Sequence, residues 1–301
     1  MSRIVYILLY VWIATCSRLP FWLLYFYSHS LYLIIYYVLG YRRRVVRANM
    51  AASFPDRSPM ELRRMERAFY RHFADYIVET IKMAAISEEE IRRRMLFLNP
   101  QLVDGLMNSG HSCILMATGH FGNWEWCTAG GAFFEDARVW QIYRPLRSKA
   151  FDRLYIRLRT RFGAQGIKKN ESLRSIIRLR QSGARSIIAV LADQTPSLHN
   201  INYRTRFLNR DTAFLDGIER IAKKLDLPVI YADVKQLRRG YYTVEFLEIT
   251  SAPRQTPDFF ITEKYARLME QTILRNPSLW LWTHKRWKHT ANNTIDNINY
   301  S

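Results

Sequence analysis

Short, almost wholly apolar runs separated by amphipathic stretches constrain the fold of this chain most. Residues 113–117, 187–192 and 227–232 each carry nearly continuous aliphatic or small side chains. Such runs predict strands buried on both faces, as in a parallel sheet. A fourth segment alternates apolar residues with Thr243 and Glu245, which predicts an antiparallel or edge strand.

Helices are expected between these strands. Ser58-Pro59-Met60-Glu61 forms a capping box with proline at the first helical position, and an apolar stripe follows it as far as Ile81. Further helices are expected over residues 87–95 and 216–225. Strands interleaved with helices predict an α/β fold with a mixed, largely parallel sheet flanked by helices.

The first forty residues are the most hydrophobic part of the chain. Residues 4–39 are nearly all aliphatic or aromatic, and residues 21–39 are long enough to cross a bilayer as a helix or to lie in its interface. Arg42, Arg43, Arg44 and Arg47 follow, as expected for a cytoplasmic anchor on anionic headgroups. We therefore expect a membrane anchor over residues 1–45 and a catalytic domain over residues 46–301.

The charge balance requires an anionic partner. Lys and Arg number 45 against 26 Asp and Glu, which gives a net charge of +19. Nucleic acid, an anionic membrane surface and an acidic carrier protein are the candidates. The hydrophobic start favours the membrane over nucleic acid. The three cysteines lack metal or redox spacing, which indicates a reducing compartment, and we expect Cys113 and Cys127 to be small core residues.

A candidate catalytic segment, residues 118–125, lies where the first apolar strand ends. A continuous helix would point His120 and Glu125 about 140° apart. They can approach only if His120 lies in a turn made by Gly119 and Gly122, while Glu125 begins a helix capped by Asn123. A histidine held by a carboxylate can take a proton from a hydroxyl group.

A second carboxylate competes for the role of partner to His120. Asp193 and Gln194 follow the apolar run 187–192, at the strand end where ligands bind in parallel sheets. The sequence leaves open which of Glu125 and Asp193 holds the histidine. Backbone N–H groups from Gly122 to Trp124, with the Asn123 side chain, are candidate donors to an anionic intermediate.

Two further segments suggest binding surfaces. Within the basic stretch 141–166, we expect Arg144 to grip a phosphate, because the following Pro145 restricts its backbone, and Arg161 is a second candidate. Near the end of the chain, Trp280, Trp282 and Trp287 alternate with basic residues, which suits a membrane interface. We find no spacing of histidine, cysteine and carboxylates that predicts a metal site.

The His-x4-acid pattern is shared by glycerolipid acyltransferases, and the longer form Gly119-His120-Phe121-Gly122-Asn123-Trp124-Glu125 resembles the bacterial late acyltransferases of lipid A biosynthesis, the lauroyl/myristoyl transferase family. Other segments match that family in order: Arg47-Ala48-Asn49-Met50, Ser53-Phe54-Pro55, Tyr143-Arg144-Pro145-Leu146, Ala192-Asp193-Gln194-Thr195-Pro196 and residues 281–288. The sequence departs from the family at residues 207–212, where a glycine-containing run is more usual.

The resemblance implies a function. It implies a glycerolipid acyltransferase-like fold and a membrane-bound O-acyltransferase of the bacterial inner membrane, with His120 and Glu125 as catalytic residues. An acyl carrier protein thioester or acyl-CoA would donate the chain to a hydroxyl of a lipid A precursor, without cofactor. Related enzymes acylate other glycolipids or amino-acid lipids. A non-catalytic basic protein that binds the membrane surface is the alternative from another class.

Overall fold

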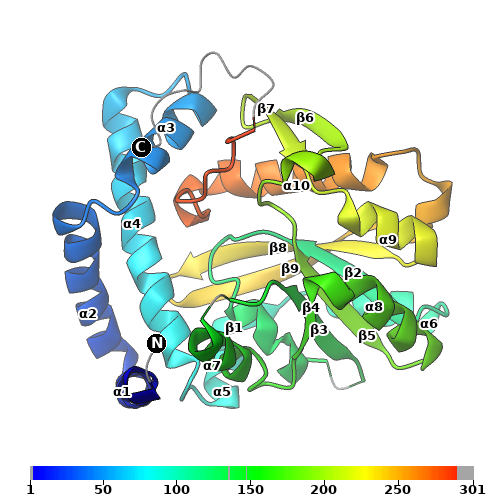
Figure 1. Ribbon diagram of the computed structural model, residues 1–301, viewed down its shortest axis with the longest axis horizontal. Coiled ribbons are helices and arrows are strands. Elements are labelled where there is room, and N and C mark those ends of the chain that lie inside the picture. Colours follow the sequence, from blue (N-terminus) through cyan, green and yellow to red (C-terminus); the bar gives the residue numbers. More distant parts are fainter. Residues whose placement is uncertain (1–2, 135, 147, 290–301) are drawn as a thin grey trace.

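A mixed seven-stranded sheet forms the centre of the protein (Figure 1). The computed structural model describes residues 3–134, 136–146 and 148–289, with the side chains of residues 3–9 left out. The strands are ordered β1-β9-β8-β2-β5-β3-β4 across the sheet. Their bounds are β1 (Met95–Phe97), β2 (Cys113–Thr118), β3 (Arg138–Tyr143), β4 (Gln165–Lys168), β5 (Ser186–Leu191), β8 (Val229–Arg238) and β9 (Tyr241–Thr250).

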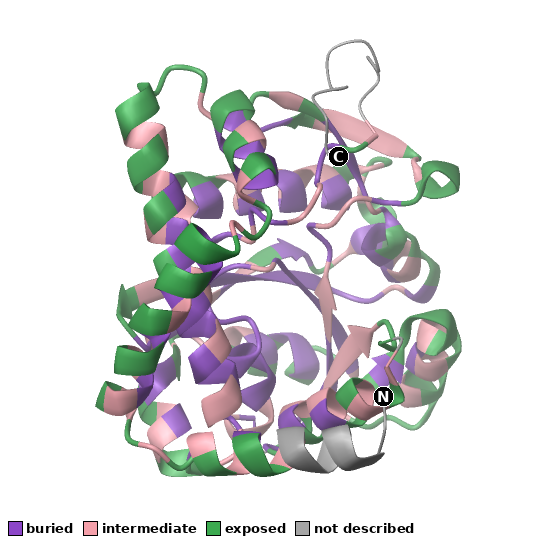
Figure 2. Ribbon diagram, turned by 60° about the vertical axis from the view of Figure 1, so that its left-hand side comes forward, coloured by how far each residue is buried: buried purple, intermediate pink, exposed green. Residues whose placement is uncertain are grey.

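The pairing of the strands confirms the fold class expected from the sequence. Strands β8, β2, β5, β3 and β4 run parallel to one another, and β9 runs antiparallel to β8. Every residue of β2 is buried, because helices cover both faces of the sheet. Cys113 and Cys127 are buried free thiols, as expected for small core residues. The purple centre of Figure 2 is this core.

Helices lie on both sides of the sheet, with α9 and α10 on one side and α5 and α7 on the other in Figure 1. The capping box is present as expected: the Glu61 N–H donates to Ser58 Oγ at 3.3 Å, and the Ser58 N–H donates to Glu61 Oε2 at 2.9 Å. The helices of this body are α4 (Pro59–Lys82), α5 (Glu88–Arg94), α6 (Gln101–Asn108), α7 (Lys149–Arg159), α8 (Ser172–Gln181), α9 (Gly217–Leu225) and α10 (Phe260–Arg275).

The N-terminal helices pack beside the long helix α4 (Figure 1). They are α1 (Arg3–Cys16), α2 (Phe21–Leu33), which continues through a π-helical turn at Ile34–Val38, and α3 (Arg43–Ser53). Among the described residues, the stretch Phe21–Val38 alone is long and apolar enough to cross a membrane, by length and composition. Only 28% of this stretch is buried inside the protein, and Trp22, Phe26 and Val38 are exposed. Its outer face is therefore available to lipid.

A small antiparallel hairpin lies where the sequence departs from the pattern of the family it resembles. Strands β6 (Tyr203–Phe207) and β7 (Arg210–Phe214) are joined by Leu208 and Asn209, whose φ angles are 49° and 63°. Positive φ at both central residues is the conformation that glycine adopts most easily. Here Asn209 donates to Ser53 O at 3.1 Å, and Leu208 is buried. Tertiary contacts therefore hold a turn that glycine would otherwise favour.

Candidate active site

Two adjacent parallel strands deliver the candidate catalytic residues. Thr118 of β2 pairs with Leu191 of β5, and both strands end there. His120 and Asp193 therefore each lie two residues beyond their strand, at the same edge of the sheet. This is the edge where parallel α/β sheets bind ligands.

Asp193 holds His120 by two hydrogen bonds. The imidazole Nδ1 lies 2.7 Å from Asp193 Oδ1, and the His120 backbone N–H donates to Asp193 Oδ2 at 2.9 Å. Trp280 Nε1 also donates to Oδ2, at 2.8 Å. Burial alone would raise the pKa of Asp193, but the adjacent His120 and these donors hold it well below its usual range. The carboxylate is therefore ionised.

The network also determines which ring nitrogen of His120 carries the proton. An ionised carboxylate can only accept hydrogen bonds, so Nδ1 carries the hydrogen that points to Asp193. Nε2 is then unprotonated, and the Gln194 side-chain amide, 3.2 Å away, donates to it. The basic nitrogen of the pair thus lies on the side of Gln194, which lines a large cavity.

Gly119 is in close contact with its surroundings beside this pair. A Cβ atom on Gly119 would lie 2.5 Å from the Sδ of Met269 and 3.3 Å from the Asp193 carboxyl carbon. Met269 is fully buried, so its thioether would have to shift within the core to accept a side chain here. The absence of a side chain at this position lets the backbone place His120 against Asp193.

Glu125 has a different partner from the one the His-x4-Glu spacing suggested. Its two oxygens accept hydrogen bonds from Arg159 of α7, at 2.7 Å from Nε and 2.6 Å from Nη2. Burial would lower the pKa of Arg159, but the pairing with Glu125 raises it overall. Glu125 and His120 line the same cavity, and of the two candidate carboxylates it is Asp193 that hydrogen-bonds to the imidazole.

The helix expected to begin at Glu125 is a 3-10 helix (Trp126–Ala132). Gly130 and Gly131 weaken an α-helix, and a Cβ on Gly131 would collide with the Phe162 carbonyl. Glu125, not Asn123 as expected, is the N-cap residue of this helix, although Asn123 Oδ1 accepts from the Trp126 N–H at 3.2 Å and so holds the turn before it. Its Nδ2 donates to the buried Glu79 of α4 at 2.7 Å.

Further contacts position the turn. The Trp124 ring packs edge-on to His120, with centroids 5.2 Å apart, and stacks on Tyr76 at 4.1 Å. The Gly122 N–H donates to Leu279 O at 3.0 Å, so this group is already engaged within the protein. His72 of α4 is buried, and its Nε2 lies 3.2 Å from Gly122 O.

The tryptophans near the end of the chain are part of the site, which corrects the expectation of an interfacial segment. Trp280, Trp282 and Trp287 are almost fully buried. Trp280 forms a bridge with Phe121 and donates to Asp193. Because each indole N–H has an acceptor within the protein, these rings pack against the catalytic turn and leave little surface for lipid.

A cavity of about 960 Å³ opens in front of His120. Its wall combines apolar side chains of the central strands with Trp124, Glu125, Gln194 and, at the rim, the exposed Arg144. Arg161 lies elsewhere: it donates to Met83 O at 2.8 Å and to Ile86 O, just after the end of α4. The cavity can hold a long apolar chain next to a basic nitrogen.

A second histidine near the site is unsuited to act as base. His284 Nε2 accepts from the Thr195 N–H at 3.2 Å, and burial lowers its pKa to about 4. In the part of the chain that the structure describes, no group of three or more histidine, cysteine or carboxylate side chains could hold a metal ion. The arrangement supports proton transfer at Nε2 of His120.

Distant sequence motifs converge on this site. Asn49 of α3 donates to Trp282 O and to His284 O, both at 3.0 Å, so the segment around residue 49 braces the segment that supports Asp193. A family model described as bacterial lipid A biosynthesis acyltransferase matches residues 1–289. No curated protein matches the chain.

Proposed function

Because the chain belongs to the bacterial lipid A biosynthesis acyltransferases, we propose that it transfers a fatty acyl chain from a thioester to a hydroxyl group of a lipid A precursor. The observation that carries this proposal is the His120–Asp193 pair. Its unprotonated Nε2 borders a cavity of about 960 Å³ with apolar walls. A base beside an apolar chamber is what acyl transfer to an alcohol requires.

The reaction follows from the pair. Nε2 of His120 takes the hydroxyl proton as the alcohol oxygen attacks the thioester carbonyl carbon, and the ionised Asp193 stabilises the resulting imidazolium. The tetrahedral intermediate then collapses as its carbon–sulfur bond breaks. The imidazolium returns the proton to the departing thiolate, so the products are an ester and a free thiol, with no acyl-enzyme.

Gln194 is suited to stabilise the oxyanion. In the resting structure its amide donates to Nε2 of His120. An incoming hydroxyl group must displace that amide to deliver its own proton to Nε2, which leaves the Gln194 N–H groups next to the reacting carbonyl. Side-chain amides perform this role in other acyl-transfer sites. Asn123 is committed to Glu79 and Trp126, so its task is to hold the turn.

The basic surface suits an anionic donor. Acyl carrier protein is acidic and acyl-CoA is polyanionic, and both would be attracted by a protein with a net charge of +19. Arg144 at the cavity rim is placed to meet a phosphate of the donor or the acceptor. We favour acyl carrier protein as the acyl donor. We place the protein at the inner membrane with the cavity on the cytoplasmic side, because the arginines after residue 41 follow the apolar stretch.

Mass spectrometry of total lipids tests the proposal. Cells that lack this protein should accumulate a lipid A precursor short of one acyl chain, and the wild-type protein should restore the full species while His120→Ala should not. A missing chain on another glycolipid or on an amino-acid lipid would reassign the acceptor. Unchanged lipids in the deletion strain would contradict acyl transfer.

A further inference from the structure

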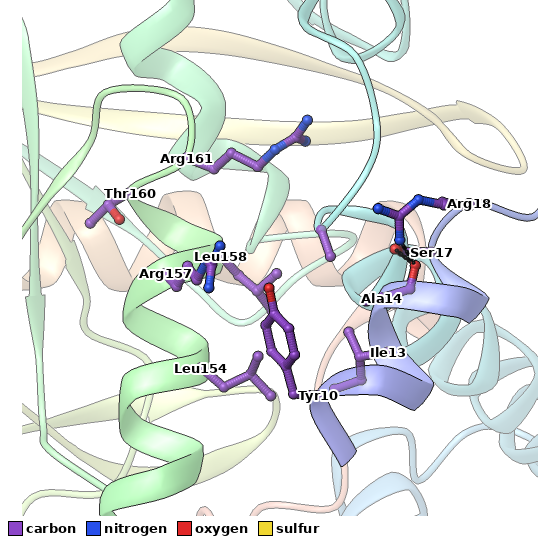
Figure 3. A pocket seen from close by; sticks show the side chains of 11 residues that line it. Tyr10, Ile13, Ala14, Ser17, Arg18, Leu154, Arg157, Leu158, Thr160 and Arg161 are labelled. Atoms are coloured by element: carbon purple, nitrogen blue, oxygen red, sulfur yellow. Dashed lines mark hydrogen bonds between the residues drawn. The ribbon is translucent and has the colours of Figure 1, made fainter. Parts of the chain in front are cut away.

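A second cavity, of about 440 Å³, lies between α1 and α7, outside the catalytic cavity. Figure 3 shows it with Tyr10 and Ile13 of α1 facing Leu154 and Leu158 of α7. Ile13, Leu154 and Leu158 are buried and form an apolar floor. The cavity is therefore walled on one side by the first hydrophobic helix of the chain.

Three guanidinium groups surround this floor. Arg157 and Arg161 come from α7 and the loop that follows it, and Arg18 comes from the turn that follows α1 (Figure 3). No aspartate or glutamate lines the cavity among the described residues. Positive charges gathered around a cavity with no acidic side chain favour an anionic ligand.

The groups that these three arginines contact are uncharged, so they do not neutralise the guanidinium charges. Arg157 lies over the Tyr10 ring, 5.2 Å from its centroid. Arg18 donates to Ala14 O at 2.5 Å, and Arg161 donates to the carbonyl oxygens of Met83 and Ile86. Within the described residues, none of the three arginines forms an ion pair with a carboxylate. Each guanidinium keeps further N–H donors for a ligand, because it carries five.

We propose that this cavity binds the phosphate headgroup of an anionic phospholipid, with the first carbons of its acyl chains on the floor made by Ile13, Leu154 and Leu158. The lipid source is favoured by the neighbourhood of the cavity. Val11 and Trp12 on α1 are exposed apolar side chains, each 54% exposed, so a bilayer in contact with α1 would bring headgroups to the three arginines. The binding does not depend on acyl transfer and is measured separately from it.

Calorimetric titration of the full chain in a neutral detergent tests this site. The probes are dihexanoyl phosphatidylglycerol, dihexanoyl phosphatidylcholine and inorganic phosphate. We expect one phosphatidylglycerol per chain, bound more tightly than either other probe, because only this lipid combines a net negative headgroup with acyl carbons. Equal affinity for phosphatidylcholine would overturn the anionic specificity, and equal affinity for inorganic phosphate would overturn the lipid source.

Matched variants separate the site from the net charge of the protein. R18E/R157E should weaken phosphatidylglycerol binding about tenfold or more. R220E/K224E makes the same charge change on exposed positions of α9, which lies across the molecule from α1, and should bind as the wild type does. Ala14→Phe should also weaken binding, by filling the cavity. Equal losses in both charge-reversal variants, or unchanged binding in Ala14→Phe, would overturn the proposal.

Discussion

Asp193→Asn removes one charge beside the proposed base and changes almost no volume. In the wild type, Asp193 Oδ2 accepts two N–H groups, from His120 and Trp280, and Oδ1 accepts one, from Nδ1 of the imidazole. The asparagine oxygen will take the position with two donors. Its NH2 group then faces Nδ1, which must give up its hydrogen to accept, and Nε2 becomes protonated.

Two effects of the substitution therefore act in the same direction. The favoured tautomer presents an N–H group to the hydroxyl instead of a lone pair, and the imidazolium loses its counter-charge. Opposite charges about 4 Å apart attract by about 4 kcal/mol at an effective dielectric constant of 20. Since each 1.36 kcal/mol is tenfold in rate, kcat should fall about a thousandfold.

The assay is acyl transfer from an acyl carrier protein thioester to a lipid A precursor by the purified protein, read by mass spectrometry of the product. Glu125→Gln is the matched control, because it removes the same charge from a carboxylate that lines the same cavity but binds Arg159. It should lower thermal stability, and its kcat should remain at least about tenfold higher than the kcat of Asp193→Asn. If Asp193→Asn keeps nearly normal turnover, or if folded Glu125→Gln loses as much, the assignment of Asp193 as the partner of His120 is wrong.

Three further predictions concern other positions. Desolvation raises the pKa of the buried Glu79 from 4.5 to about 7, so between pH 4.5 and about 7 the folded state retains a proton that the unfolded chain loses. In denaturant titrations, the stability of the wild type should therefore fall by about 3 kcal/mol relative to that of Glu79→Gln over this pH range. A stability difference between the two proteins that does not change with pH would contradict this. Gln194→Leu should lower kcat about a hundredfold with little change in fold, and an unchanged kcat would exclude an oxyanion role. Gly131→Ala meets the Phe162 carbonyl and should cost about 1–3 kcal/mol in thermal denaturation, whereas Gly105→Ala, in open space, should not.

The sheet was predictable because its signal is local. The apolar runs 113–117 and 187–192 coincide with most of β2 and β5, the run 227–232 covers the start of β8, and the alternation after residue 241 identified the antiparallel strand β9. The capping box likewise marked the start of α4. Patterns of burial and capping depend on residues that are close together in the sequence, so a single sequence is enough to recognise them.

The partner of His120 depends on long-range geometry and was only half predictable. Strand-end position singled out Asp193 as a candidate, but spacing along the chain favoured Glu125 equally. The decision comes from Arg159, 34 positions further on, whose guanidinium donates to both carboxylate oxygens of Glu125. The role of Trp280 was missed, since an aromatic next to basic residues also suits a membrane interface and only tertiary packing shows the indole donating to Asp193.

Arg161 shows the same limit. Its position in a basic stretch suggested a substrate contact, but the guanidinium binds the carbonyl oxygens of Met83 and Ile86 and borders the second cavity. Only a weak signal in the sequence distinguishes Arg144, which lines the catalytic cavity, from Arg161, which does not. Arg144 directly follows β3, and strand ends in this sheet point to the catalytic cavity.

The central claim is that His120 is the base for acyl transfer, and turnover by purified His120→Ala tests it most directly. The account predicts that the folded variant transfers no acyl chain above the background rate. His111→Ala, a histidine at the opposite end of β2 that does not line the cavity, should retain wild-type turnover in the same assay. Nearly normal acyl transfer by His120→Ala would contradict the account.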